Sequence, residues 1–393
     1  MGLFSGGKKN EIIAIFDIGS GSVGGALVEL RGAEKPRILF SVREDIAFQN
    51  NFKFERFFAS MLRSFGLVLK RLAAKEKKVG KVMCVLSAPW YVSQTRTIVS
   101  EEQKPFLVTQ KRVDHLIEKE IIKIKESFDS KYGDVIDSST EVLEMRSTHI
   151  KLNGYETNTP FDKHAEKFEA SLYVSMGSSK VLQTIREKVR AQYKVKDVSF
   201  HSFSLVSFST LRDMCSDAKD FIVLDISGEA TDITVVRQDT LVETLSFPFG
   251  KHFVLRTIAS RLGISLEEAY SSMVLFVEGK ATKEAAKKMN IILTHCGGQW
   301  LDMFKESLDS LSVYTILPAK IFLITDEPFS EWFAKTTKSV DCNKLSLIGE
   351  EFVIDVLRPN VLAKFGNFDI NVPRDIFITI EALFAHKILN NEE

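Results

Sequence analysis

The chain has 393 residues, of which 45% are hydrophobic and 26% charged, so it can form more than one buried core and shows no bias toward disorder. Lysine plus arginine and aspartate plus glutamate each total 52, which excludes a broad positive field of the kind that binds nucleic acid. Four widely separated cysteines predict neither a zinc site nor a disulfide framework, and no apolar run is long enough to cross a membrane, so we expect a soluble protein.

The first predicted element is a buried strand at residues 12–16, which runs into Asp17 and a turn of glycine and serine. An aspartate at the end of a strand can hold a hydrated Mg²⁺ ion, and glycines let backbone N–H groups approach a phosphate. Serine hydroxyls add donors to such a nest. The predicted phosphate residues of this turn are Asp17, Gly19, Ser20, Gly21 and Ser22. Taken alone, the turn is explained equally well as a tight hairpin.

The following segments alternate between helical and strand-like patterns of apolar residues. The predicted helices and strands lie at 23–30, 54–78, 82–86, 111–128, 141–152 and 168–174. The pair Asn153-Gly154 predicts a hairpin turn, because both residues tolerate positive φ. This middle part is predicted to be a small α+β module inserted into the first domain.

A second strand-and-turn unit follows a predicted helix at 178–193 and a strand at 195–200. The apolar run 221–224 leads into Asp225, and Gly228 and Thr231 follow in a polar turn. Two turns of this kind in matching contexts can hold the β- and γ-phosphates of a nucleotide from opposite sides of a cleft. The long-range similarity of the two halves predicts a duplicated mononucleotide-binding fold.

The last third is predicted to be mainly helical. Ser265-Leu-Glu-Glu268 is a capping box that starts a helix, and 284–311 is predicted to be mostly helical. Gly297-Gly298 is interpreted as a packing bend, with a helix break near a pocket as the alternative. A short buried strand is expected at 321–324. The segment 377–389 is moderately amphipathic and ends in acidic residues, so we expect it to pack on the protein rather than on anionic lipid.

At these motifs the chain resembles a known family. Asp17-Ile-Gly-Ser resembles the first phosphate motif of the actin, Hsp70 and sugar-kinase superfamily, and residues 224–233 resemble the second. The Asn-Gly-Tyr turn and the following proline in 150–160 are similar to the inserted domain of the FtsA branch. Over residues 11–335 the chain is similar to the bacterial FtsA and PilM proteins.

The resemblance implies an actin-like (ribonuclease H-like), duplicated two-domain α/β fold with an inserted, SHS2-like α+β module. It places the first domain at 11–94 and 177–218, the inserted module at 95–176, the second domain at 219–372 and a C-terminal helix at 373–393.

The resemblance also implies a function. The implied cofactors are ATP and Mg²⁺, with Asp17 and Asp225 holding the metal and with Gly250 and Thr325 added to the nucleotide site. The implied role is a cytoplasmic scaffold at the inner face of the cell membrane, in FtsA-like division or PilM-like pilus assembly. Its expected partner is a tubulin-like division protein or a short cytoplasmic segment of a pilus membrane protein, with self-assembly as a further expectation.

Several departures from the family pattern limit this interpretation. Ser227 and Glu229 interrupt the usual glycines of the second turn, and no glycine follows Ile324 where the adenosine motif is expected. No residue is predicted to be catalytic. Slow ATP hydrolysis, a nucleotide-independent pseudo-ATPase and, with less support, a small-molecule kinase of the same superfamily therefore stay open.

Overall fold

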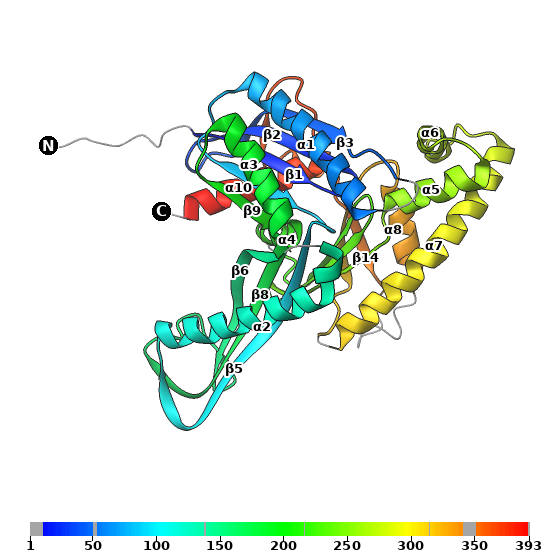
Figure 1. The fold of residues 1–393 in the computed structure, drawn as a ribbon. Coiled ribbons are helices and arrows are strands. Elements are labelled where there is room, and N and C mark those ends of the chain that lie inside the picture. The colour runs from blue at the N-terminus through cyan, green and yellow to red at the C-terminus, as the bar shows by residue number, and fades with distance from the viewer. Residues whose placement is uncertain are drawn as a thin grey trace.

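The computed structural model describes residues 11–49, 53–136, 139–215, 217–313, 315–340 and 351–391. Its strands form three sheets, each accompanied by helices (Figure 1). Cys84, Cys215 and Cys296 are free thiols, and Cys342 lies outside the described residues.

The first sheet has the strand order β15-β3-β2-β1-β4-β9. Its strands are β1 (Glu11–Ile18), β2 (Ser22–Leu30), β3 (Arg37–Asp45), β4 (Val82–Leu86), β9 (Val198–Ser202) and β15 (Asn367–Phe368). Strands β1, β2 and β3 are antiparallel neighbours, whereas β4 and β9 add in parallel. Helices α1 (Phe54–Lys75) and α3 (Ser179–Tyr193) pack their apolar faces on one side of this sheet.

The second sheet repeats this arrangement in the order β12-β11-β10-β13-β14. Its strands are β10 (Phe221–Ile226), β11 (Thr231–Arg237), β12 (Thr240–Phe247), β13 (Lys320–Thr325) and β14 (Val353–Val356). Strands β10, β11 and β12 are antiparallel, and β13 and β14 are parallel additions, as in the first sheet. The predicted duplication is therefore present at the level of topology.

The helices of the second half cover the outer face of the second sheet. They are α5 (Lys251–Leu262), α6 (Leu266–Val277), α7 (Lys283–Ser312) and α8 (Ser330–Lys338). The capping box at Ser265 and Glu268 is present as predicted. Helix α7 is continuous through Gly297-Gly298, so a break at this place is wrong. Gly297 lies beside Trp332 and Thr336 of α8.

The inserted module has its own sheet, with the order β5-β8-β6-β7. It comprises β5 (Tyr91–Val108), α2 (Gln110–Ile136), β6 (Thr140–Leu152), β7 (Tyr155–Glu156) and β8 (Lys163–Ser178). Asn153 and Gly154 both have positive φ, as the hairpin prediction required. The module projects from the rest of the molecule, and its inner end meets both domains (Figure 1).

A shared core joins the two domains. Helices α4 (Phe203–Met214) and α10 (Ile376–Asn391) lie between the two sheets and bury apolar side chains against both. The expectation that the C-terminal helix packs on the protein is thus confirmed. The predicted second domain, 219–372, differs from the structure at its end, because β15 pairs with β3 of the first sheet after the short helix α9 (Pro359–Leu362).

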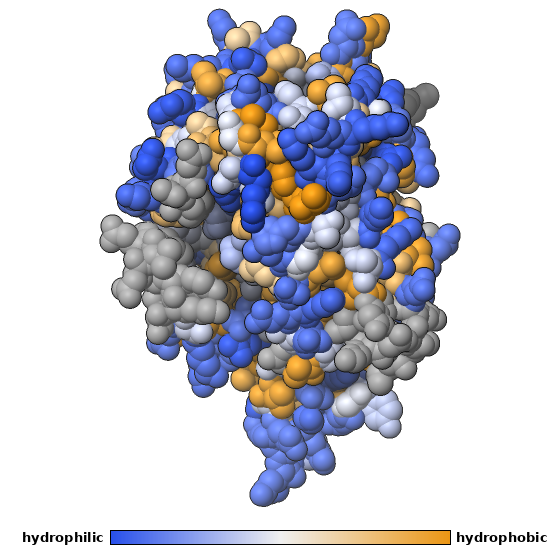
Figure 2. Space-filling view, turned by 90° about the vertical axis from the view of Figure 1, so that its right-hand side faces the viewer, coloured by the Kyte–Doolittle hydropathy of each residue, from blue (hydrophilic) through white to orange (hydrophobic). Residues whose placement is uncertain are grey.

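The outer surface carries scattered apolar groups. Leu275 and Val277 of α6 and Ile291 of α7 are among the exposed apolar side chains. Figure 2 shows the face formed by these helices, where orange patches lie among blue side chains. None of the described helices is both long and apolar enough to span a membrane.

Candidate functional site

The two predicted phosphate turns lie directly against each other. A Cβ atom placed on Gly228 would be 2.5 Å from the Cα atom of Gly21, so the two backbones are in van der Waals contact. The Oγ atoms of Ser20 and Ser227 are 2.7 Å apart, and the backbone N–H of Glu229 donates to Ser20 Oγ at 2.8 Å. The structure therefore brings the two turns together and joins them by hydrogen bonds.

The start of helix α5 closes the second turn from its other side. A Cβ on Gly250 would lie 2.4 Å from the carbonyl oxygen of Ser227, which leaves room only for glycine. The backbone N–H groups of Lys251 and His252 donate to the carbonyls of Ser227 and Gly228 at 3.0 and 2.9 Å. The N–H groups of a helix N-terminus often bind an anion, but two of these already have protein acceptors.

Asp17 forms an ion pair with a cationic side chain of the same protein. It is 2% exposed and forms an ion pair of 2.7 Å with Arg43 of β3, which also donates to Asp375 at 2.7 Å and to Ser22 Oγ at 2.9 Å. Burial opposes the charge on Arg43, but Asp375 and Asp17 raise the pKa of its guanidinium above the ordinary value. Arg43 therefore stays charged and supplies the positive charge beside Asp17.

Glu381 of α10 is a third carboxyl group in this cluster. It is fully buried, and burial together with the nearby charge of Asp17 raises its pKa well above the usual range. Burial also raises the pKa of Asp17, an effect that Arg43 opposes. A protonated Glu381 carries no charge, so Asp17 and Asp375 are the carboxylates that pair with the Arg43 guanidinium.

Gly24 makes this arrangement possible. It lies opposite Asp17 in the β1–β2 ladder, and a Cβ at this position would be 2.7 Å from an Nη atom of Arg43. Any larger residue would displace the guanidinium from its place over the strand. The glycine pair after the first turn thus has a packing role beside the predicted phosphate geometry.

Asp225 has the opposite environment. It is 3% exposed, and both of its carboxylate oxygens are buried without a hydrogen-bond partner. Burial and the charges of Asp232 and Asp17 raise its pKa well above the ordinary value. The neighbouring Lys251 pairs instead with Asp326, and burial lowers the pKa of Lys251 to about 8. Asp225 is therefore the residue of the predicted set that keeps free acceptor capacity.

The remaining predicted residues have structural partners. Thr231 Oγ1 donates to the Phe249 carbonyl at 2.6 Å and accepts from Trp300 Nε1 at 3.2 Å. Thr325 Oγ1 donates to the carbonyl of Ile226 at 2.7 Å, and the carbonyl of Gly19 accepts from Trp90 Nε1 at 2.8 Å. These hydroxyls and backbone groups hold the turns in place.

Glu229, which interrupts the glycines of the second turn, points toward α5. Its carboxylate accepts from both Nη atoms of Arg256, at 3.0 and 2.7 Å, and lies 3.0 Å from Nδ1 of His252. Although burial raises the pKa of Glu229, these hydrogen bonds lower it below its usual value. The negative charge of Glu229 is thus matched within the protein.

These contacts test whether a nucleotide fits between the turns as they stand. A phosphate needs free N–H and O–H donors and space between the two loops, and here the loops touch. The N–H groups of Gly19, Ser227 and Glu229 donate to acceptors within the chain, and the hydroxyls of Ser20 and Ser227 bond to each other. The described residues contain no group of three or more His, Cys, Asp or Glu side chains that could hold a metal ion. With Gly21 and Gly228 in contact, a phosphate has no space between the turns unless they separate.

Sequence reasoning found both aspartates but missed the side chains that surround them. Arg43, Asp375 and Glu381 are distant in sequence and come together only because β3 and α10 pack on β1 and β2. The Gly24-Gly25 pair was visible in the sequence, but nothing in it identified Arg43 as the group that approaches.

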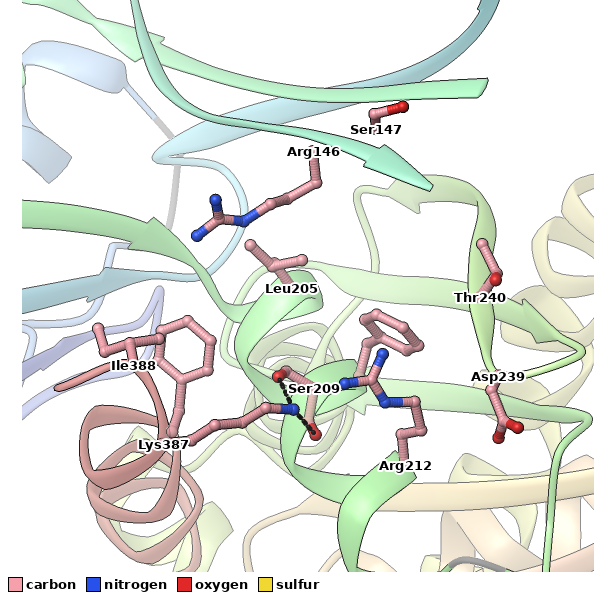
Figure 3. A pocket seen from close by; sticks show the side chains of 11 residues that line it. Arg146, Ser147, Leu205, Ser209, Arg212, Asp239, Thr240, Lys387 and Ile388 are labelled. Atoms are coloured by element: carbon pink, nitrogen blue, oxygen red, sulfur yellow. Dashed lines mark hydrogen bonds between the residues drawn. The ribbon is translucent and has the colours of Figure 1, made fainter. Parts of the chain in front are cut away.

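A cavity of about 510 Å³ lies where the inserted module meets the shared core. Arg146 and Ser147 of β6 face Leu205, Ser209 and Arg212 of α4 and the end of α10 (Figure 3). Lys387 Nζ donates to Ser209 and pairs with Asp213 at 2.6 Å. Arg146 has no ion-pair partner among the described residues, whereas Arg212 also pairs with Asp213, and Asp239 lies on the same rim. The cavity therefore combines an apolar floor with a rim of both charges, in which, of the described residues, Arg146 is the unpaired cation.

Comparison with known proteins supports the fold. No protein-family model matches the chain, and no curated protein matches its sequence. A chain in the structure of a PilM–PilN type IV pilus biogenesis complex matches with a TM-score of 0.63 and 13% identity, over 97% of this chain and 98% of that chain. At this identity the match shows the fold alone.

Two further solved structures were found with lower similarity. The ethanolamine utilization protein EutJ from Carboxydothermus hydrogenoformans matches with a TM-score of 0.44 and 11% identity, over 96% of this chain and 89% of that one. A Bacteroides thetaiotaomicron protein with an actin-like ATPase fold matches with a TM-score of 0.39 and 8% identity, over 98% and 99%.

Proposed function

We propose that this protein, with its actin-like, duplicated two-domain α/β fold, is a scaffold of a membrane-associated assembly whose interdomain cleft is held closed by its own side chains. The observation that carries the proposal is the direct contact between the turns at Gly21 and Gly228. In this scaffold Arg43 supplies, beside Asp17, the positive charge that Mg²⁺ would otherwise bring.

A protein that binds its partner without nucleotide has no need of an open phosphate site. The hydroxyls of Ser20 and Ser227 bond to each other across the two turns, and Glu229 has a bidentate partner in Arg256. These contacts support the nucleotide-independent alternative over ATP-driven closure. They give the scaffold one stable domain arrangement that does not depend on the ATP concentration.

A nucleotide-binding switch is the second candidate, and one observation favours it. The carboxylate of Asp225 is buried with no hydrogen-bond partner, which is costly unless the group is protonated or meets a cation. If the turns separated, Asp225 would be the residue to hold hydrated Mg²⁺. The charge of the metal would then stabilise the phosphate oxygens of ATP.

For the partner, the proposal follows the PilM side of the family resemblance. The matching chain belongs to a complex of PilM with PilN, and we propose that this chain likewise holds a short segment of a membrane protein at the cytoplasmic face. The cavity of Figure 3 is suited to this, because Arg146 and Arg212 surround an apolar floor. A tubulin-like division partner is the alternative that the FtsA resemblance implies.

The nucleotide part of the proposal is tested by following thermal unfolding during titration with ATP and Mg²⁺, with phosphate release assayed in parallel. The closed scaffold predicts neither a shift nor turnover at millimolar ATP. A shift without phosphate release would favour the switch, and transfer of phosphate to an added sugar or acetate would favour a kinase.

The partner site is tested by fluorescence anisotropy with labelled cytoplasmic segments of division and pilus proteins encoded near this gene. Arg146→Glu with Arg212→Glu is expected to weaken binding about tenfold or more, because two favourable charges become repulsive. Arg190→Glu, on the exposed side of α3, is the matched control. Equal binding by all variants would exclude the cavity as the site.

A further inference from the structure

The second sheet ends in a strand whose outer edge has no neighbouring strand among the described residues. Strand β14 pairs with β13 and is last in the strand order. The first sheet differs at the corresponding place, because its edge strand β9 is followed at once by α4 in the shared core. An edge strand of this kind offers N–H and C=O groups to another extended chain.

The direction of these groups follows from the ladder. The N–H groups of Val353 and Leu357 donate to β13, at the carbonyls of Ala319 and Leu323. Because backbone groups alternate along a strand, those of Ile354 and Val356 point away from β13. The free edge therefore presents the N–H and C=O groups of two residues, Ile354 and Val356.

A groove of about 680 Å³ runs along this edge and reaches both faces of the strand. On one face it is bounded by Ala334, Lys335 and Lys338 of α8, which covers the outer side of the sheet. On the other face, the groove is lined by Met214 from the end of α4 and by Val361 of α9. Figure 1 shows β14 beside α8 at this side of the second domain.

The two sides of the groove differ in chemistry. The α8 side is basic: Lys335 and Lys338 lie one turn apart, and neither has a carboxylate partner among the described residues. The one acidic residue of this helix that lines the groove, Glu331, pairs with Arg358. The opposite side combines apolar side chains with Lys364 and with Asp355, which pairs with Lys320. A strand laid along β14 would direct alternate side chains to these two sides.

We infer that β14 is a docking edge for an extended segment of a partner protein in which acidic and apolar residues alternate. The segment adds to the second sheet through the backbone groups of Ile354 and Val356. Its acidic residues face Lys335 and Lys338, and its apolar residues face Met214 and Val361. This is recognition by strand addition, in which main-chain bonds give affinity and alternate side chains give specificity.

The probe is a fluorescent peptide of about eight residues, an ordinary strand length, with alternating glutamate and valine. It is titrated against the full-length protein by anisotropy. A peptide of identical composition with glutamates and valines in two blocks is the control, because it has the same charge without the alternation. Tighter binding of the alternating peptide is expected, and equal binding of both would overturn the inference.

Backbone addition has a distinctive signature. Two versions of the peptide carry N-methyl groups on all odd or on all even residues, which blocks one edge of the strand or the other. One version is expected to lose binding about tenfold or more and the other to keep it, because only one edge meets β14. If both versions bind equally well, or both equally badly, the peptide does not add as a strand.

The basic side is tested by Lys335→Glu with Lys338→Glu, and Lys305→Glu on the exposed side of α7 is the control. The paired change is expected to weaken the alternating peptide about tenfold at low salt, and the control to leave it unchanged. Sedimentation of the unliganded protein completes the test. If the protein is a dimer and the paired change dissociates it, a second copy of the chain occupies the edge of β14. That result would contradict the inference that a segment of a partner protein binds there.

Discussion

The turns at Asp17 and Asp225 begin equivalent units of the two domains, yet their aspartates are completed in opposite ways. Each ends the central strand of its sheet and is followed by an antiparallel hairpin. Asp17 meets Arg43, whereas neither carboxylate oxygen of Asp225 has a partner. A shared motif thus fixes the backbone geometry, and side chains from distant elements decide what the motif binds.

The two turns differ because of the segment that follows the second sheet in the sequence. Helix α10 returns to the first domain and brings Glu381 to Asp17, and the turn before it brings Asp375 to Arg43. At the second turn the cation that lies close, Lys251, pairs with Asp326 instead. Burial raises the pKa of both aspartates, but the first turn has a cation beside its carboxylate and the second does not.

The largest effect is expected from removing the cation of the first turn. Arg43→Met leaves Asp17 and Asp375 without their shared partner, and breaking such a buried pair costs about 3 kcal/mol of unfolding free energy. Urea unfolding of the wild-type protein and the variant measures this loss of unfolding free energy. Arg31→Met removes an exposed pair with Glu29 and should change stability by less than about 1 kcal/mol. Equal losses in the two variants would show that the Arg43 cluster is not special.

The contact between the turns is probed by adding one methyl group. Gly228→Ala places a Cβ 2.5 Å from the Gly21 backbone and should cost about 1–3 kcal/mol, because neither loop can move without losing its hydrogen bonds. Gly298→Ala in α7 meets no atom within 4 Å and should instead gain about 0.5–1 kcal/mol. Chemical denaturation of both variants decides; a neutral Gly228→Ala would mean that the turns are not in contact.

The second turn should respond in the opposite sense to loss of its charge. Asp225→Asn is expected to raise stability by about 1 kcal/mol at pH 7, because the carboxylate is buried without a partner. The pKa of Asp225 in the folded protein lies above its unfolded value of 3.8. The stability that this carboxyl group contributes is therefore fully present below pH 3.8 and is lost as the pH rises through the folded pKa.

The gain from Asp225→Asn should therefore widen between pH 4 and 8, since asparagine does not titrate. Unfolding curves at several pH values measure this. Asp17→Asn is the matched change at the first turn and should lose stability, because it removes the charge that Arg43 pairs with. Destabilisation of both variants to the same extent would remove the asymmetry between the turns.

The smallest effect is expected at Glu381. Its pKa is raised well above the ordinary range, so glutamine mimics the protonated side chain and can still donate to Asp17. Glu381→Gln should change the unfolding free energy by less than about 0.5 kcal/mol. A loss of several times this size would show that Glu381 is charged in the folded protein.

Much of the fold was predictable because it depends on local patterns. The buried strands before Asp17 and Asp225, the turn at Asn153-Gly154 and the cap at Ser265 were all identified from residues close in sequence. The glycine pair at Gly297 shows the limit of this reasoning, since it does not break helix α7, which continues from Lys283 to Ser312.

The site was predictable only in part, for a physical reason. Residues 17–22 and 225–231 fix two turns, but the occupancy of those turns depends on β3, α5 and α10, which are distant in sequence. No spacing rule connects Arg43 with Asp375. Whether a hydroxyl such as Ser20 meets a phosphate or another serine is decided by tertiary packing, which the motif does not contain.

The most direct test of the account is a disulfide between the two turns. Ser20 and Ser227 have Oγ atoms 2.7 Å apart, so Ser20→Cys with Ser227→Cys, in a background without the four native cysteines, places two thiols within reach. The account predicts rapid crosslinking under mild oxidation, seen as loss of both free thiols, at a rate that ATP with Mg²⁺ does not change. Failure to crosslink, or crosslinking that ATP with Mg²⁺ prevents, would contradict a cleft closed by the chain itself.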